Sequence, residues 1–178
     1  FLPNTYELPC DITPRSLVLR LKSESDKFWA DPKRQEQLER IGFTQLEVMT
    51  LASIVHEETN AQSEMARIAG VYINRLNKDM LLQADPTVKY ALADPSIKRI
   101  LKRHLKIDSP YNTYIHKGLP PAPIAMPDIV AIDAVLNYEH HDYIYFCARP
   151  EFDGMHNFAV TLKEHEANAK AYHDALNE

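Results

Sequence analysis

The apolar pattern of the chain runs with almost no polar gap from Leu46 to Val55, which predicts a buried helix. Thr44 and Glu47 fit a capping box, so we expect this central helix to begin near Thr44. The polar run HEETN then ends it. The stretch LASIVHEETN therefore places acidic residues at the end of a buried helix.

Glu58 is the acidic residue that the apolar face of this helix should carry inward. The residues three, four and seven positions before it are Val55, Ile54 and Leu51, all apolar. The same positions before Glu57 include a serine and a threonine, which make a wetter face. We therefore expect Glu58 to be the less hydrated carboxyl, with a raised pKa that suits a general acid near neutral pH. On helix geometry alone, the alternative is a helix end whose acids both face solvent.

The first part of the chain contains further helix signals. Residues 1–13 hold prolines and short polar side chains, which predict an extended lead-in on the surface of the domain. A first-turn proline follows Thr13 and Asp31, so a helix should begin after each. The first should run through Trp29, and Gly42 should close the second.

A fourth helix should follow the central one closely. Ser63 can cap it, and its apolar positions continue to Asn77 or Lys78. The short connection predicts a helical hairpin with Glu58 near the joint. A carboxyl at such a joint can be partly buried and still reachable.

The middle of the chain leaves one alternative open. If residues 81–87 are extended, Gln83 and Asp85 point the same way; alternatively, Asp85 only caps a helix from Pro86 to Leu92. Residues 96–106 predict a basic amphipathic helix with a solvated basic face. The sequences SPYNTY and GLPPAP are too proline-rich for regular structure, and either cover a cleft or connect elements rigidly.

The last third should contain a helix, a hairpin and a final helix. The helix follows Asp128 and ends near Tyr138. Residues 143–148 have the β-branched and aromatic content of a strand, and residues 156–160 are its expected antiparallel partner. A second capping box, Thr161 with Glu164, begins a helix through Leu176.

Composition and charge narrow the classes of function. The chain has 178 residues, of which 45% are hydrophobic and 25% charged, as in an ordinary single globular domain. Its net charge of -5 and scattered basic residues argue against a nucleic-acid partner. Cys10 and Cys147 are too few for a disulfide framework. No apolar run is long enough to span a membrane, and the chain starts without Met, so we expect a piece of a longer protein.

Known short motifs exclude several chemistries. HEETN superficially resembles the zinc motif HExxH, but Asn60 stands where the second His is needed. EHHD, at residues 139–142, is better interpreted as a solvated turn, and His156 as a structural hydrogen-bonding residue that could alternatively line the cleft. GxSxG, P-loop and GxGxxG motifs do not occur in the sequence. We therefore expect no metal and no cofactor.

Four longer blocks carry a resemblance to a known family: LASIVHEETN, RIAGVYINRLNKDMLLQADPTVKYAL, YNTYIHKGLPPAPIAMP and DYIYFCA. Their order and spacing resemble the lysozyme-like lytic transglycosylases, in which the catalytic Glu is followed by Ser or Thr, then a Gln motif, then a Tyr-Asn motif. More closely, they resemble the YceG-like family of endolytic murein transglycosylases, over nearly the whole chain. The family usually has Glu at the position of His56, and LPPGP in place of residues 119–123.

The resemblance implies an α+β fold, a mainly helical lysozyme-like catalytic domain with a small β-hairpin. Residues 14–178 would form the catalytic lytic transglycosylase domain, and residues 1–13 would lead in from a missing N-terminal part. The domain would cleave the β-1,4 bond between MurNAc and GlcNAc inside peptidoglycan glycan strands and leave 1,6-anhydro-MurNAc ends.

The resemblance also implies the residues of the site. Glu58 would be the single catalytic acid/base, in agreement with the burial argument. The substrate-binding residues would be Gln83, Tyr111 and Asn112, with Thr59, Asp85, Thr87, Thr113 and Tyr114 as their neighbours. The parent would be a bacterial inner-membrane protein that faces the periplasm or cell wall. Its anchor and a LysM-like domain would be absent here, and peptidoglycan synthases would be its partners.

Two rival functions remain. The first is a glycan-binding or scaffold module of the cell wall synthesis machinery that has lost turnover. The second is ordinary muramidase hydrolysis, for which Asp85 would have to act as the base because such glycosidases use two carboxyl groups. Product analysis separates the second from a transglycosylase, since hydrolysis leaves a reducing end.

Overall fold

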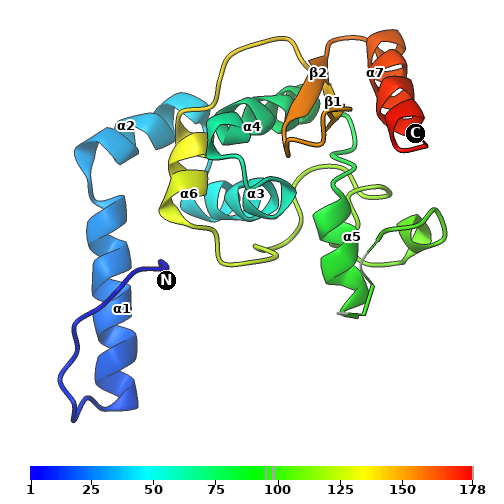
Figure 1. Ribbon diagram of the computed structural model, residues 1–178. Helices are drawn as coiled ribbons and strands as arrows, with labels where there is room; N and C mark the ends of the chain where they lie inside the picture. The colour runs from blue at the N-terminus through cyan, green and yellow to red at the C-terminus, as the bar shows by residue number, and fades with distance from the viewer. Residues whose placement is uncertain (95, 98, 178) are drawn as a thin grey trace.

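Seven α-helices, a short 3₁₀ helix and a two-stranded sheet make up the regular structure of the computed structural model, which describes residues 1–94, 96–97 and 99–177 (Figure 1). The helices are α1 (Pro14–Trp29), α2 (Pro32–Ile41), α3 (Gln45–Glu58), α4 (Gln62–Asn77), α5 (Asp85–Leu92), α6 (Ile129–Leu136) and α7 (Leu162–Ala175). The 3₁₀ helix η1 spans His104–Lys106, and the strands are β1 (Tyr145–Ala148) and β2 (His156–Ala159). The predicted mainly helical α+β class is confirmed.

Helix α3 lies at the centre of the fold and packs against α4, α5 and α6. Its residues Val48, Leu51, Ile54 and Val55 have no exposed surface. Burial of each such side chain contributes about 1.5–3 kcal/mol, so the packing of this helix is a main source of stability. The prediction of a buried central helix is confirmed, and its last residue is Glu58.

The capping signals in the sequence are confirmed where polar side chains bind free backbone N–H groups. Thr44 and Glu47 form the capping box of α3, and Thr161 and Glu164 that of α7. Gly42 ends α2 in the left-handed conformation, with φ of 70°, which glycine adopts without steric cost.

Two helix starts differ from the prediction. Helix α4 begins at Gln62 after Ala61, so Ser63 lies in the first turn and does not cap it. Helix α5 begins at Asp85 itself, with Ala84 as its N-cap and no side-chain cap. Asp85 is thus the first residue of the helix and not its cap, and its carboxylate accepts a hydrogen bond from the Tyr114 hydroxyl. Helix α6 ends at Leu136, slightly before the predicted end.

The predicted helix over residues 96–106 is wrong for the described part of that segment, and Lys98 lies outside the described residues. Only η1 is helical there. The physical reason is tertiary: the buried amide of Asn112 donates to the carbonyls of Leu105 and Ile107 at 3.0 and 2.8 Å. These carbonyls are thereby bound to a loop, whose anchoring stabilises an irregular path.

The N-terminal segment runs back beside α1, which extends away from the helical body (Figure 1). Most of residues 1–13 is exposed, as predicted for a surface lead-in. Leu2 is the exception, because it is buried in the same apolar cluster as Trp29 at the end of α1. The lead-in is therefore attached to the core at its beginning.

The β-hairpin pairs Tyr145 with Ala159 and Ala148 with His156, and α7 packs on both strands. The segment that leads to it is fastened to α4, where Asn74 donates to the carbonyl of His141 at 2.6 Å. Residues 139–142 are therefore an irregular segment and not the expected turn; His140 and Asp142 are exposed as expected, whereas Glu139 and His141 are half-buried. A side chain at Gly70 would meet the Glu139 carbonyl oxygen at 2.4 Å, so this contact requires glycine.

Candidate active site

Glu58 is the last residue of α3, and its side chain is half-buried. Burial raises the pKa of its carboxyl to about 7, although a hydrogen bond from Tyr72 opposes the shift; the negative charge of Asp85 adds to it. The Tyr72 hydroxyl lies 3.2 Å from Glu58 Oε2. The expected burial of Glu58 is confirmed, and Glu57 is exposed as predicted.

A pocket of about 250 Å³ opens at the Glu58 carboxyl. Four of the predicted site residues line it together: Glu58, Gln83, Asp85 and Tyr114. The remaining lining residues are Tyr72, Arg75, Leu82, Phe146 and His165. The pocket therefore joins the end of α3, one face of α4, the start of α5, the β-hairpin and α7.

Gln83 lies in this pocket because Arg75 and the loop that contains Thr113 hold it there. Arg75, on α4, donates to the carbonyl of Leu82 at 2.9 Å and to Gln83 Oε1 at 3.2 Å. The Gln83 N–H donates to the carbonyl of Thr113 at 3.1 Å. These bonds hold Gln83 at a φ of 54°, which a non-glycine residue rarely adopts. Such a conformation is typical of positions where function requires the geometry.

Asp85 and Tyr114 form a hydrogen-bonded pair on the same side of the pocket. The Tyr114 hydroxyl donates to Asp85 Oδ1 at 2.6 Å. Burial and this carboxylate both raise the pKa of Tyr114 well above its ordinary value, so its phenol keeps its proton. Because Asp85 accepts this bond, it presents an oriented carboxylate to the pocket that Glu58 shares.

Three of the predicted contact residues, Thr87, Asn112 and Thr113, are buried beneath the site. Asn112 has no exposed surface, and Tyr114 N–H donates to its side-chain oxygen at 3.0 Å. Thr87 and Thr113 are buried and hydrogen-bonded to each other at 2.8 Å. Thr113 also accepts the N–H of Ala84. These side chains position Gln83, Asp85 and Tyr114.

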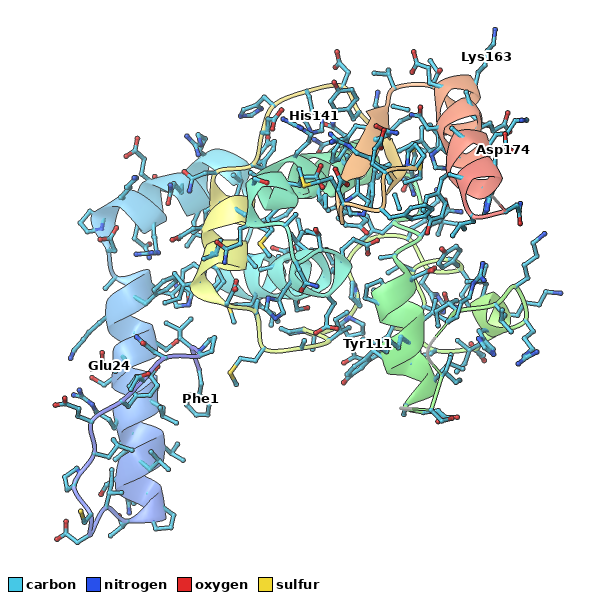
Figure 2. All side chains as sticks on the ribbon, viewed as in Figure 1. Phe1, Glu24, Tyr111, His141, Lys163 and Asp174 are labelled. Carbon is cyan, nitrogen blue, oxygen red and sulfur yellow. The ribbon has the colours of Figure 1, made fainter. Side chains whose placement is uncertain are left out.

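Thr59 and Tyr111 lie at the edges of the predicted site. Thr59 is buried, accepts the N–H of Ala61 at 3.0 Å and borders a second pocket beside Glu58. Tyr111 lies beside α5 (Figure 2), where its ring packs on Tyr90 at 4.7 Å between centroids. It does not line the pocket at the Glu58 carboxyl.

Besides Leu82, four aromatic or charged residues of the pocket were not predicted from the sequence. Tyr72 and Arg75 are three positions apart on α4, and an arginine in phase with a buried tyrosine could have indicated them. Phe146 belongs to the predicted strand, and its inward direction depends on the register of the hairpin. His165 follows the capping box of α7 and carries no signal in the sequence. Burial and the charge of Arg75 lower its pKa, so it is neutral at neutral pH.

Two histidines that the sequence marked have structural partners. His56 faces Asp128 at the start of α6, with 3.7 Å between Nδ1 and Oδ1, and does not line the Glu58 pocket. His156 contacts the buried Glu64 at 2.9 Å and also borders the second pocket, so both interpretations of this residue apply. Within residues 1–94, 96–97 and 99–177, no cluster of three His, Cys, Asp or Glu side chains has the geometry of a metal site.

Comparison of the sequence with known proteins finds a family and relatives that match most of the chain. The model of the YceG-like family matches residues 1–171. An endolytic murein transglycosylase from Bacillus subtilis (strain 168) is 43% identical over 131 residues, which cover 74% of this chain and 36% of the relative. One from Streptococcus pneumoniae serotype 2 (strain D39) is 31% identical over 170 residues, 93% of this chain and 30% of the relative.

The fold has a solved counterpart in a yceG-like protein from Listeria monocytogenes. That crystal structure superposes with a TM-score of 0.81 at 35% identity and covers 93% of this chain and 53% of the other. The chain spans about a third of the length of the curated relatives that it matches. No α-helix in the part of the chain that the structure describes is long and apolar enough to cross a membrane.

Proposed function

The chain belongs to the YceG-like family, and on that basis we propose that it is the catalytic part of an endolytic peptidoglycan lytic transglycosylase. Its substrate is the β-1,4 bond between MurNAc and GlcNAc within a glycan strand. The observation that carries the proposal is the Glu58 carboxyl, whose pKa of about 7 keeps a large protonated fraction at neutral pH. The names of the two relatives support the substrate class.

In the proposed reaction, Glu58 acts first as an acid and then as a base. The protonated carboxyl donates its proton to the glycosidic oxygen, and the bond from that oxygen to C1 of MurNAc breaks. The C6 hydroxyl of the same MurNAc then attacks C1, and the Glu58 carboxylate accepts its proton. The products are a 1,6-anhydro-MurNAc end and a free GlcNAc hydroxyl, and Glu58 is protonated again.

The neighbours of Glu58 have separate roles in this proposal. Tyr72 stabilises the carboxylate after the first proton transfer, because its hydroxyl donates to Glu58 Oε2. Gln83 presents an exposed amide to the acetamido groups and hydroxyls of the sugars. Asp85, oriented by Tyr114, is close enough to Glu58 for its negative charge to stabilise the positive charge that develops at C1.

Hydrolysis is the second candidate, because Asp85 lines the same pocket as Glu58. A hydrolase of the common kind uses one carboxyl as the acid and a second as base or nucleophile. Asp85 would have to take the second role. The distinguishing product is a reducing MurNAc end in place of the anhydro end.

The test is digestion of purified peptidoglycan by the wild type, Glu58→Gln and Glu39→Gln, with the products identified by mass spectrometry. Glu39 lies on the exposed face of α2 and serves as the matched control. We expect anhydro-muropeptides from the wild type and the control, and none from Glu58→Gln. Reducing ends would favour hydrolysis. Binding of glycan without any product would favour the scaffold function.

The assignment of residues 14–178 as the catalytic domain belongs to the same proposal. The membrane anchor, the inner-membrane location and the link to peptidoglycan synthases stay predictions from the family resemblance. They concern the longer parent protein and can be tested by fractionating cells that express it.

A further inference from the structure

Glu58 also lines two more pockets. One, of about 440 Å³, lies toward α5 and is bordered by Asp85, Lys89 and Arg99. The other, of about 330 Å³, lies toward the β-hairpin turn and α7. Glu58 is the residue that all three pockets share, so hollows toward α5 and toward the β-hairpin both border it. Such an arrangement suits a polymer that extends past Glu58 in both directions, rather than a small ligand that ends at this residue.

The pocket toward the hairpin turn and α7 has an aromatic surface that is not part of the hydrophobic core. Phe152, in the hairpin turn, is 56% exposed, and its ring lies 5.7 Å from the ring of Tyr172 on α7. Both residues line the pocket beside Glu58. One face of a pyranose ring carries C–H groups, and aromatic rings bind that face by stacking. An aromatic pair with one exposed and one half-buried ring in a pocket is therefore a suitable surface for binding a sugar.

The backbone at Phe152 is strained for the residue that occupies it. Its φ is 54°, a left-handed conformation that is unfavourable for a bulky side chain. The neighbouring Gly154 adopts φ of 78° without that cost. A strained, exposed aromatic residue in a pocket indicates a constraint other than stability.

The turn that carries Phe152 is held firmly enough to present it. Arg149 donates to the carbonyl of His156 at 3.2 Å and pairs with Asp153 at 3.6 Å. The His156 N–H and ring are bound to the buried carboxylate of Glu64. The exposed side chain of Asn60 adds an amide to the rim of the same pocket.

We propose that the hairpin turn and α7 form a saccharide-binding subsite on one side of Glu58, in which Phe152 and Tyr172 stack on a sugar of the glycan strand. The proposal rests on the proposed function for the identity of the strand. It extends the site to residues outside the Gln and Tyr-Asn motifs. The pocket toward α5 binds the part of the glycan strand beyond the cleaved bond, so that the strand is cut within its length.

The test measures binding without turnover. All variants carry Glu58→Gln, and the probe is a peptide-free octasaccharide of alternating GlcNAc and MurNAc, titrated by calorimetry. We expect Phe152→Ala and Phe152→Leu to weaken binding roughly tenfold, and Phe152→Trp to bind like Phe152. Leu162→Ala is the control, because this side chain is 53% exposed on α7 and lies outside the pocket.

Comparing Phe152→Gly with Phe152→Ala distinguishes a structural role of Phe152 from a role in sugar binding. Glycine relieves the left-handed strain, so Phe152→Gly should have the higher Tm of the two. Their affinities for the octasaccharide should nevertheless be equally low. If affinity rises with Tm between these variants, or if Phe152→Ala binds like the control, the subsite is wrong.

The outcomes also separate this subsite from the proposed function. Binding that depends on Phe152, together with a wild type that forms no anhydro products, would support the subsite and refute the transglycosylase reaction. Anhydro products together with binding that is independent of Phe152 would refute the subsite alone. An octasaccharide that does not bind the Glu58→Gln protein would refute the subsite, and the digestion of peptidoglycan alone would then decide the proposed function.

Discussion

The raised pKa of Glu58 has a consequence for stability that does not depend on the substrate. The native carboxyl has a pKa of about 7, whereas its ordinary value is 4.5. Between these two values the native state keeps the proton that the unfolded chain has released, so the free energy of unfolding falls as the pH rises. Each pKa unit corresponds to about 1.4 kcal/mol. Above pH 7, Glu58 should therefore destabilise the fold by about 3 kcal/mol relative to its effect below pH 4.5.

Replacement of Glu58 by Gln removes this titration and keeps the size of the side chain. The difference in free energy of unfolding between Glu58→Gln and the wild type should grow by about 3 kcal/mol between pH 4 and pH 8, with the mutant more stable at pH 8. Taking the difference cancels the groups that titrate in both proteins. For a chain of 178 residues, such a change corresponds to a Tm difference of about 6–12 °C.

The assay is urea unfolding of the wild type, Glu58→Gln and Glu39→Gln at pH 4, 6 and 8, followed by circular dichroism. Glu39→Gln, at an exposed position of α2, is the control against which a constant or a changing Glu58→Gln difference is judged. A Glu58→Gln difference that is equally constant would mean that Glu58 titrates normally. The argument that burial prepares it as a general acid would then fail.

Two further predictions concern the surroundings of Glu58. Tyr72→Phe removes the hydroxyl that donates to the Glu58 carboxylate, so the pKa of Glu58 should rise. The alkaline limb of the pH–rate profile should then move upward by roughly half to one pH unit. A limb that stays in place or moves to lower pH contradicts the role of Tyr72. Gly70→Ala should lower the free energy of unfolding by about 2 kcal/mol in urea titration, because its Cβ would meet the Glu139 carbonyl at 2.4 Å and the clash exceeds the gain in helix propensity. Ser63→Ala, at an exposed position of the same helix, is the control and should change the free energy of unfolding little. If Gly70→Ala loses no more stability than Ser63→Ala, the contact with Glu139 is unimportant.

Local patterns were sufficient to predict Glu58. Its burial followed from helical spacing, because the residues three, four and seven positions earlier belong to the same helix and share its inward face. The caps at Thr44 and Thr161 were predictable for the same reason, since a capping box is complete within four residues. Interactions between neighbours in sequence need no knowledge of the rest of the fold.

Asn112 shows where this reasoning reaches its limit. The family resemblance gives Asn112 a place among the sugar-binding residues, and the fold adds that its side-chain amide donates to the carbonyls of Leu105 and Ile107. The same bonds explain why residues 96–106 do not form the helix that their amphipathic pattern predicts. A buried side chain and a distant backbone segment determined each other's conformation, and neither stretch carries that information alone.

The amino-acid sequence by itself determined the central helix, the inward carboxyl at its end and most helix boundaries, because these depend on periodicity and on caps a few residues apart. The tertiary structure alone decided that Tyr72 and Arg75 complete the pocket, that Asn112 and Thr113 are buried beneath it, and that Phe152 lines a second pocket with Glu58. These relations join α3 to α4, α5, the β-hairpin and α7. They exist only after hydrophobic burial has brought distant segments together, and no local pattern encodes the distance between them.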